Sequence, residues 1–198
     1  MKIKLSILIP AYNEGSTVHL ILDKVRDVVL PDGITKEIII VNDFSSDNTV
    51  EKIEDYKSKN PELGIQLFSQ QKNKGKGAAI HKAIELAKGD YLIVQDADLE
   101  YDPEEYNLLL KPILSGFADV VYGSRFMGGN PHRILFFWHS IGNKFLTYLS
   151  NMVTNLNLTD METCYKLIRS DIAKGLSLKE NRFGFEPELT AKLSRIPE

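Results

Sequence analysis

One short stretch, residues 89–99, constrains the fold of this chain more than any other. Residues 90–94 are rich in apolar and β-branched side chains, which predicts a strand, and the apolar run stops at Gln95-Asp96-Ala97-Asp98. A strand of a parallel sheet is buried on both faces and can be apolar throughout. The carboxyl end of such a strand opens into the crevice where open α/β sheets bind ligands. The sequence therefore predicts a ligand site at Asp96 and Asp98.

The close spacing of these carboxylates indicates a metal site. Like charges so near each other repel, and a hard divalent cation removes that cost. Mg²⁺ and Mn²⁺ take oxygen ligands, commonly one or two carboxylates together with the phosphates of a substrate. We therefore interpret Asp96 and Asp98 as a clamp for a metal ion and a diphosphate. The alternative is an acidic loop that begins the next helix, which is the better explanation for an isolated Asp-x-Asp. The position at the end of a buried strand favours the clamp.

A strand and helix pattern repeats along the chain up to residue 122. Apolar runs predict strands at 4–9, 37–41, 65–69, 90–94 and 118–122. A helix with Asn13 as its cap is expected from the apolar stripe Val18, Ile21, Leu22, Val25 and Val29, and further helices are expected near 47–59, 80–87 and 103–114. Such alternation implies right-handed crossovers. The expected fold is α/β, with a mostly parallel sheet flanked by helices on both faces.

Composition and charge exclude several classes. The 198 residues favour one domain, and the net charge of −3 gives no sign of nucleic-acid binding. Cys164 is the only cysteine, so no internal disulfide can form and a reducing compartment fits. No apolar run is long enough to span a membrane. The first strand begins almost at Met1, which leaves no room for a signal peptide, and we expect a cytoplasmic location.

Residues 72–79 carry three lysines and two glycines just before a predicted helix. Backbone amides at a helix start, together with lysines, suit a phosphate. A flexible basic turn explains the segment equally well. Neither a Walker loop nor a Gly-x-Gly-x-x-Gly after the first strand is present, which argues against a nucleotide triphosphatase and a dinucleotide-binding domain.

The pattern changes after residue 126. A long helix is expected up to about residue 156, with the apolar positions Ile141, Phe145, Leu149, Met152 and Val153 packed on the sheet. For residues 134–138 an interfacial membrane anchor competes with that interpretation. The charged residues of 159–169 would ordinarily form a solvated face. A last helix is expected at 187–194, and the absence of a closing element after it indicates truncation at the C-terminus.

Five blocks in order carry a resemblance to a known family: Pro10-Ala11-Tyr12-Asn13-Glu14, Val41-Asn42-Asp43-Phe44-Ser45-Ser46-Asp47, Asn73-Lys74-Gly75-Lys76-Gly77, Gln95-Asp96-Ala97-Asp98 and Gly123-Ser124-Arg125. The chain resembles the inverting family 2 glycosyltransferases of GT-A fold. It is most similar to the branch of dolichol-phosphate mannosyltransferases and bacterial polyprenyl-phosphate glucosyltransferases. The resemblance implies a single glycosyltransferase domain, with residues 1–125 as the nucleotide-sugar-binding half and residues 126–198 on the acceptor side.

The resemblance also implies roles for individual residues. The base and ribose of a UDP- or GDP-sugar would be held by Pro10, Tyr12, Glu14 and Asp43, with Lys74 and Gly75 completing the donor site. Asp96 would meet the ribose or the sugar and share the metal site, and Asp98 would ligate Mg²⁺ or Mn²⁺. The metal would stabilise the leaving nucleoside diphosphate while the acceptor attacks from the opposite face.

The acceptor decides which other residues take part. A hydroxyl acceptor needs a carboxylate to take its proton, and Asp160 is the candidate. A polyprenyl phosphate is already anionic and needs cations, for which Arg125, Arg133 and Lys166 are the candidates. We favour the lipid phosphate as the acceptor. We therefore expect peripheral contact with the cytoplasmic face of the membrane. If the chain oligomerises, we expect a homodimer. A nucleotidyltransferase and a non-catalytic nucleotide-sugar-binding module are the rival interpretations.

Overall fold

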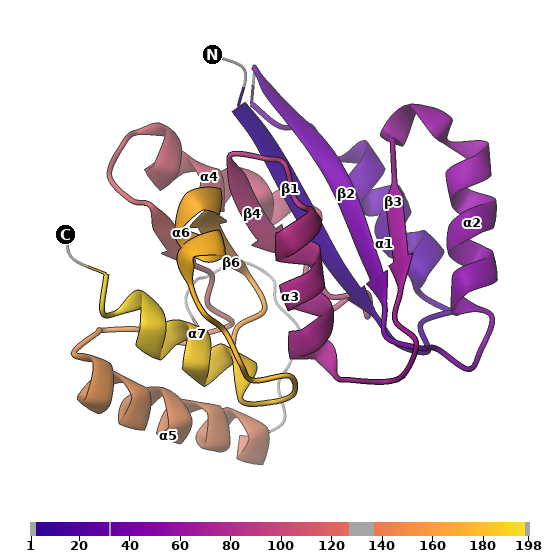
Figure 1. Cartoon of the computed structure of the whole chain (residues 1–198). Coiled ribbons are helices and arrows are strands. Elements are labelled where there is room, and N and C mark those ends of the chain that lie inside the picture. The colour runs from indigo at the N-terminus through magenta and orange to yellow at the C-terminus, as the bar shows by residue number, and fades with distance from the viewer. Residues whose placement is uncertain (1–2, 32, 127–136, 197–198) are drawn as a thin grey trace.

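The computed structural model describes residues 3–31, 33–126 and 137–196. Its centre is a six-stranded sheet in the order β3-β2-β1-β4-β6-β5 (Figure 1). The strands are β1 (Ile3–Ala11), β2 (Ile34–Asn42), β3 (Gln66–Ser69), β4 (Tyr91–Val94), β5 (Val120–Tyr122) and β6 (Lys166–Arg169). The α-helices are α1 (Val18–Asp27), α2 (Thr49–Lys59), α3 (Lys76–Leu86), α4 (Tyr106–Leu114), α5 (Phe137–Thr154), α6 (Ser170–Gly175) and α7 (Phe185–Leu193), with short 3₁₀ turns at Pro61–Leu63 and Pro103–Glu105.

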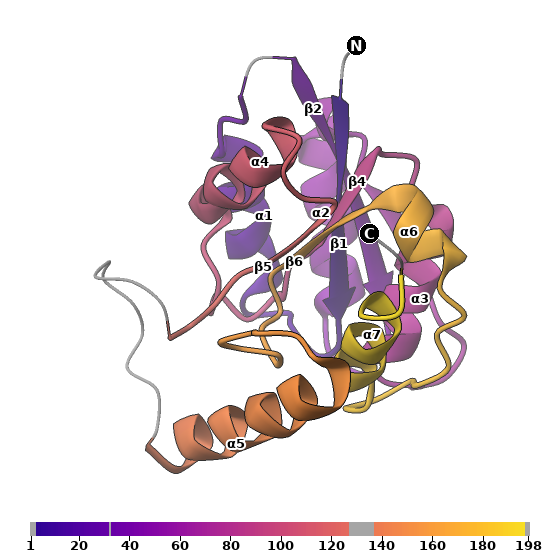
Figure 2. The ribbon, with the colours of Figure 1, turned by 90° about the vertical axis from the view of Figure 1, so that its left-hand side faces the viewer.

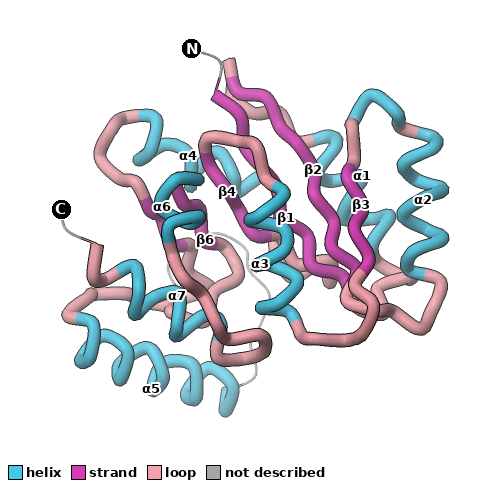
Figure 3. The backbone as a smooth tube through the Cα atoms, viewed as in Figure 1, coloured by secondary structure: helices cyan, strands magenta, loops and turns pink. Residues whose placement is uncertain are grey.

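The sheet is mostly parallel, as expected. β1 pairs in parallel with both β2 and β4, and β2 pairs in parallel with β3. Helices cover both faces: α1 and α4 lie on one side and α3 and α6 on the other (Figures 2 and 3). The central strands are therefore buried on both faces, which is why their sequences are almost continuously apolar. The carboxyl ends of β1, β2 and β4 meet at one edge.

The first helix is shorter than its predicted stripe. Its buried face of Val18, Ile21, Leu22 and Val25 is confirmed. The inclusion of Val29 is wrong, because the helix ends at Asp27 and Val29 is 79% exposed. Asn13 does not cap the helix either. It adopts a left-handed backbone, and its side-chain carbonyl accepts the Ser46 N–H at 2.8 Å.

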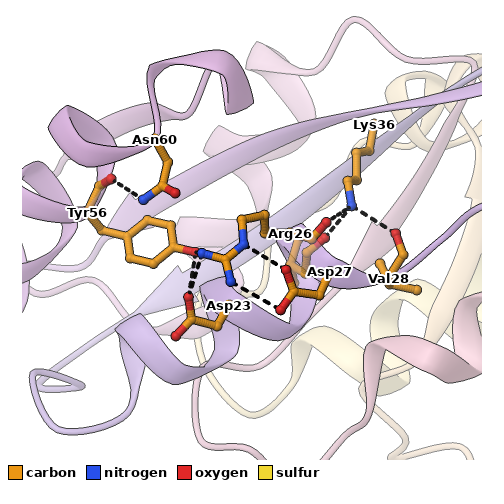
Figure 4. A network of polar contacts seen from close by, with 8 residues as sticks. Asp23, Arg26, Asp27, Val28, Lys36, Tyr56 and Asn60 are labelled. Carbon is orange, nitrogen blue, oxygen red and sulfur yellow. Dashed lines mark hydrogen bonds and ion pairs between the residues drawn. The ribbon is translucent and has the colours of Figure 1, made fainter.

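A network of polar contacts caps the C-terminal end of α1 (Figure 4). The Lys36 ammonium, on β2, donates to the carbonyls of Val25, Arg26 and Val28 at 2.6, 2.6 and 3.0 Å. These carbonyls lack helical partners, so one cation satisfies several orphan acceptors of the helix terminus. Tyr56 of α2 donates its hydroxyl to Asp23 of α1 at 2.9 Å. Two helices and a strand are thus tied together at the amino end of the sheet.

The strand β6 was not expected. It enters between β4 and β5 and runs antiparallel to both. The prediction of a solvated face here is wrong for the two residues that matter most, because Asp160 is 1% exposed and Lys166 is 2% exposed. Only Leu167 and Ile168 are apolar in this four-residue strand, and so short a run carries no readable period.

The long helix α5 does not pack on the sheet, so the expected packing is wrong. It lies below the sheet against α7 (Figure 1). Thr147 is the one buried residue among those described in this helix. Large apolar side chains along it are exposed: Phe137, Trp138, Ile141, Phe145, Leu146, Tyr148, Leu149, Met152 and Val153. Arg133 and most of the 134–138 run lie outside the described residues. Among the described helices, none is long and apolar enough to cross a bilayer.

Candidate active site

A pocket of about 600 Å³ lies at the carboxyl ends of β1, β2 and β4, where the sequence places its acidic motifs. The N-terminal half contributes the segments that follow these strands and the start of α3. Later parts of the chain contribute Arg125, Glu162, Arg182, Phe183 and Glu186. The lining includes seven acidic and three basic residues. This excess of carboxylates suits a cation or a dense set of hydroxyl donors.

The segment after β1 forms one wall. Pro10, Tyr12 and Glu14 all line the pocket, and the Tyr12 ring is about half exposed. The backbone N–H of Glu14 donates to the Thr49 hydroxyl at 2.7 Å, and its carboxylate accepts the Thr17 hydroxyl at 2.6 Å. These contacts hold Glu14 in place beside the first turn of α1.

Asp43, at the end of β2, organises the neighbouring wall. Its buried carboxylate accepts the N–H groups of Lys74 and Gly75 at 2.8 and 2.7 Å, and the Gln70 amide at 3.0 Å. The Ala78 N–H donates to the Asn181 carbonyl at 3.1 Å. The protein's own acceptors therefore take the N–H groups of Lys74, Gly75 and Ala78 at the helix start. Gly75 lines the pocket, whereas Lys74 lines a second pocket on the outer side of α3.

The turn after β4 is positioned by Gln95, which is fully buried. Its carbonyl accepts the hydroxyls of Tyr106 and Tyr165 at 2.7 and 2.8 Å. Its amide donates to the Asp96 and Tyr101 carbonyls at 3.0 and 3.4 Å. One side chain thus joins the core to the backbone of the Asp-x-Asp motif.

The two carboxylates of the motif differ in their partners. Asp96 pairs with the Lys76 ammonium at 2.8 Å, and that ammonium lies 3.7 Å from Glu186. Although burial works against the charge of Lys76, its pKa is raised, because Cys164, Asp96 and Glu186 lie around it. Asp98 has no basic side chain within ion-pair distance among the described residues. Burial raises the pKa of Asp98, and the negative charges of Asp96, Glu100 and Glu14 add to that rise.

A divalent cation fits this donor set only with help from a ligand. The part of the chain that the structure describes contains no group of three or more His, Cys, Asp or Glu side chains placed to hold a metal. Mg²⁺ and Mn²⁺ commonly use one or two carboxylates and take phosphate oxygens for the rest. Asp98 offers a carboxylate without a counter-charge, which is the chemistry such an ion requires.

Arg125 and Asp160 form a single unit. The Arg125 guanidinium meets both Asp160 oxygens, at 2.7 and 2.8 Å, and the Arg125 backbone N–H adds a third bond at 3.1 Å. The hydrogen bonds to Asp160 are the main reason that the pKa of Arg125 is raised. Arg125 lines the pocket, but Asp160 does not. Asp160, the carboxylate expected to take a proton, is therefore buried and fully paired with Arg125.

Lys166 is buried and does not line the pocket. Its ammonium is hydrogen-bonded to the Thr163 carbonyl and lies 5.2 Å from the centre of the Tyr122 ring. Burial lowers its pKa, and the nearby Glu186 works in the opposite direction.

Three lining carboxylates were missed by sequence reasoning: Glu100, Glu162 and Glu186. Burial raises the pKa of Glu162, and Glu186 adds to the rise. For Glu186 the only available signal was an acid at the start of the last helix. That signal does not reveal that the helix start faces the pocket.

Known proteins match the chain closely enough to show its family. The model of a family described as Glycosyl transferase family 2 matches residues 6–176. Dolichol-phosphate mannosyltransferase of Pyrococcus furiosus is 27% identical over 201 residues, which cover 98% of this chain and 55% of that protein. Dodecaprenyl-phosphate galacturonate synthase of Rhizobium johnstonii is 26% identical, over 99% of this chain and 57% of that protein. The chain therefore spans little more than half the length of these relatives.

A solved structure supports the fold. Glucosyl-3-phosphoglycerate synthase from Mycobacterium tuberculosis, crystallised with Mn²⁺, UDP and phosphoglyceric acid, has a TM-score of 0.71 at 19% identity, covering 93% of this chain and 62% of that one. At this identity the likeness shows the fold alone, and the expected GT-A architecture is confirmed. Because the family model covers most of the sequence and the strand ends carry the expected motifs, the chain belongs to glycosyl transferase family 2.

Proposed function

We propose that this domain transfers a sugar from a nucleoside-diphosphate sugar to a polyprenyl phosphate, with inversion at the anomeric carbon. The observation that carries the proposal is the pocket at the ends of β1, β2 and β4. It contains Asp98, which has no basic side chain within ion-pair distance among the described residues. The names of the two relatives, which concern dolichol and dodecaprenyl phosphates, support the acceptor class.

Residues of the N-terminal half would hold the donor. Tyr12 and Asp43, which line the pocket, would meet the base and ribose, and Asp96 would meet the ribose or the sugar. Asp98 would hold Mg²⁺ or Mn²⁺, which stabilises the charge of the leaving diphosphate. The bond from the anomeric carbon to the donor phosphate breaks, and the nucleoside diphosphate leaves with the electron pair. The new bond forms to an oxygen of the acceptor phosphate, which needs no base because it is already ionised.

The metal dependence is tested by calorimetric titration of UDP and GDP with and without Mn²⁺. We expect the preferred nucleotide to bind wild type much more tightly with the metal, and Asp98→Asn to lose that difference. Asp55→Asn, an exposed carboxylate on α2, is the matched control. Equal affinity in the presence and absence of metal for the wild type would contradict this part of the proposal.

On the acceptor side, we propose that Asp160 holds Arg125 rather than accepting a proton. Arg125 and Arg133 would then position the acceptor phosphate. The buried Lys166 would add positive charge near the site without touching the acceptor. A glycan hydroxyl is the second candidate acceptor. The observation favouring it is Glu162, a lining carboxylate whose raised pKa suits proton transfer.

Radiolabelled transfer to phytanyl phosphate, beside a panel of free sugars and oligosaccharides, separates the two acceptors. We expect transfer to the lipid phosphate, with about ten- to a hundredfold weaker use of it by Arg133→Ala. Arg195→Ala, which removes an exposed cation elsewhere, should behave as wild type. Transfer to sugars alone would exclude the lipid acceptor. Exchange of the nucleotide with pyrophosphate would indicate a nucleotidyltransferase, and binding without transfer would indicate a binding module.

We further propose that the exposed apolar side chains of α5 lie on the membrane surface. Aromatic and aliphatic groups cover this helix, including Trp138 and Phe145, and an acceptor carried by a lipid must be reached at a bilayer. Co-sedimentation with anionic vesicles should be lost in Trp138→Ser/Phe145→Ser. The control is Phe117→Ser, which removes an even more exposed ring from the turn after α4. A wild type that stays in the supernatant would refute the membrane contact.

A further inference from the structure

The pocket has more carboxylates than cations, and two of its three cations are already engaged. Lys76 is held between Asp96 and Glu186. Arg125 is held by both oxygens of Asp160. A ligand that carries several phosphate charges would meet a surface of mostly the same sign. A cation that no protein carboxylate has paired with would offset this repulsion most strongly.

Arg182 is the third lining cation. Within the described residues, no carboxylate lies within ion-pair distance of its guanidinium. Its guanidinium makes a long hydrogen bond, 3.5 Å, to the side-chain oxygen of Asn73. Asn73 in turn donates to the Asp43 carbonyl at 3.4 Å. The guanidinium therefore reaches from the far wall of the pocket toward the Asp43 side, with its donors available.

Hydrogen bonds to α7 and to α3 hold the segment that carries Arg182. The Glu188 carboxylate of α7 accepts the N–H groups of Lys179 and Glu180 at 2.8 and 2.7 Å. The Asn181 carbonyl accepts the Ala78 N–H of α3 at 3.1 Å. These bonds place the backbone next to Arg182 against the start of α3. The arginine is thus presented to the pocket by a held backbone.

The close contact depends on glycines. A Cβ on Gly75 would lie 2.5 Å from the Asn181 carbonyl oxygen, and a Cβ on Gly77 would lie 2.5 Å from the Glu180 carbonyl oxygen. Both contacts are too short for any side chain, so these two positions admit only glycine while the segment stays in place. Gly75 and Gly77 therefore allow the segment that carries Arg182 to pack closely against the start of α3.

We propose that Arg182 is a phosphate-binding residue of this pocket. Its planar fork of N–H donors matches two oxygens of a phosphate group. The phosphate can come from the diphosphate of the donor or from the acceptor, and the direction of Arg182 toward Asp43 favours the donor. The assignment of either source rests on the proposed function, whereas the phosphate site itself does not.

The first test uses inorganic pyrophosphate with excess Mg²⁺, titrated calorimetrically into the folded domain. Arg182→Gln should weaken binding about tenfold or more. Arg182→Lys should fall between wild type and the glutamine variant, because it keeps the charge and loses the fork. Lys179→Gln is the matched control, since it removes one positive charge from the same segment without lining the pocket. Absence of pyrophosphate binding by the wild type, or unchanged binding by Arg182→Gln, would overturn the assignment.

A second set of titrations identifies the source. Weaker binding of UDP or GDP by Arg182→Gln assigns the residue to the donor. Unchanged nucleotide binding with a raised KM for phytanyl phosphate assigns it to the acceptor. If both parameters are unchanged, Arg182 has no role in either substrate and the assignment fails. A wild type that binds pyrophosphate through Arg182 but binds neither nucleotide would instead refute the proposed function.

Discussion

Replacement of Gln95 by leucine should destabilise the domain more than an ordinary core substitution of equal size. Leucine has nearly the volume of glutamine but offers no acceptor. The hydroxyls of Tyr106 and Tyr165 would lose their partner, and both residues are almost fully buried, at 0% and 1% exposure. A buried hydroxyl left without an acceptor costs about 1–3 kcal/mol. The two hydroxyls together predict a loss of about 2–6 kcal/mol in the free energy of unfolding.

Urea denaturation followed by far-UV circular dichroism measures this loss. With a slope near 2 kcal/mol/M, the midpoint should fall by about 1–3 M. The control is the triple variant Gln95→Leu/Tyr106→Phe/Tyr165→Phe, which removes the stranded hydroxyls as well. Replacing both sides of a buried hydrogen bond with apolar groups of the same shape is nearly neutral, so the triple variant should regain most of the stability.

Two results would refute this reasoning. One is a Gln95→Leu variant within about 1 kcal/mol of wild type, well below the cost of stranding two buried hydroxyls. The other is a triple variant no more stable than the single one, which would show that the cost has another origin. Gln95→Glu, which keeps the acceptor and loses the amide donors to the backbone, separates the role of Gln95 in the core from its role in holding the Asp96 turn.

Three further outcomes follow from the packing. Lys36→Met should cost about 1–3 kcal/mol in urea unfolding, because three carbonyls at the end of α1 lose a charged donor; an unchanged midpoint would contradict the capping role. Gly77→Ala should destabilise the domain, against the usual gain of up to about 1 kcal/mol for this change in a helix, because its Cβ would meet the Glu180 carbonyl at 2.5 Å. Gly142→Ala in α5 has open space around it and is the control; equal effects of the two would remove the steric argument. Although burial works to raise it, the pKa of Glu188 is lowered to about 2 from 4.5 by Lys192 and two backbone N–H groups. The stability that wild type holds over Glu188→Gln should thus be full above pH 4.5 and vanish as pH falls through about 2. After allowance for solvent screening it should amount to about 1–2 kcal/mol at neutral pH, and a gap that does not change with pH would disprove the linkage.

The sequence by itself determined the parallel part of the sheet and the place of the pocket. Continuous apolar runs predicted β1, β2 and β4, and parallel strands bring their carboxyl ends to one edge. The sequence alone therefore places Asp43, Asp96 and Asp98 together, because each lies just after a strand. Their position depends only on local signals and on one rule of sheet geometry.

Only the tertiary structure decided which charges pair and which surfaces are covered. Lys76 meets Asp96, and Asp160 occupies Arg125, across 20 and 35 residues of sequence. The insertion of β6 buries Lys166, and the start of α7 brings Glu186 into the pocket. No local pattern encodes these outcomes, since the energy of an ion pair depends on the distance and burial that distant segments create. For the same reason the apolar face of α5 looked like a core face in the sequence and stands exposed in the fold: periodicity shows that a helix has an apolar side, and only its neighbours determine what covers it.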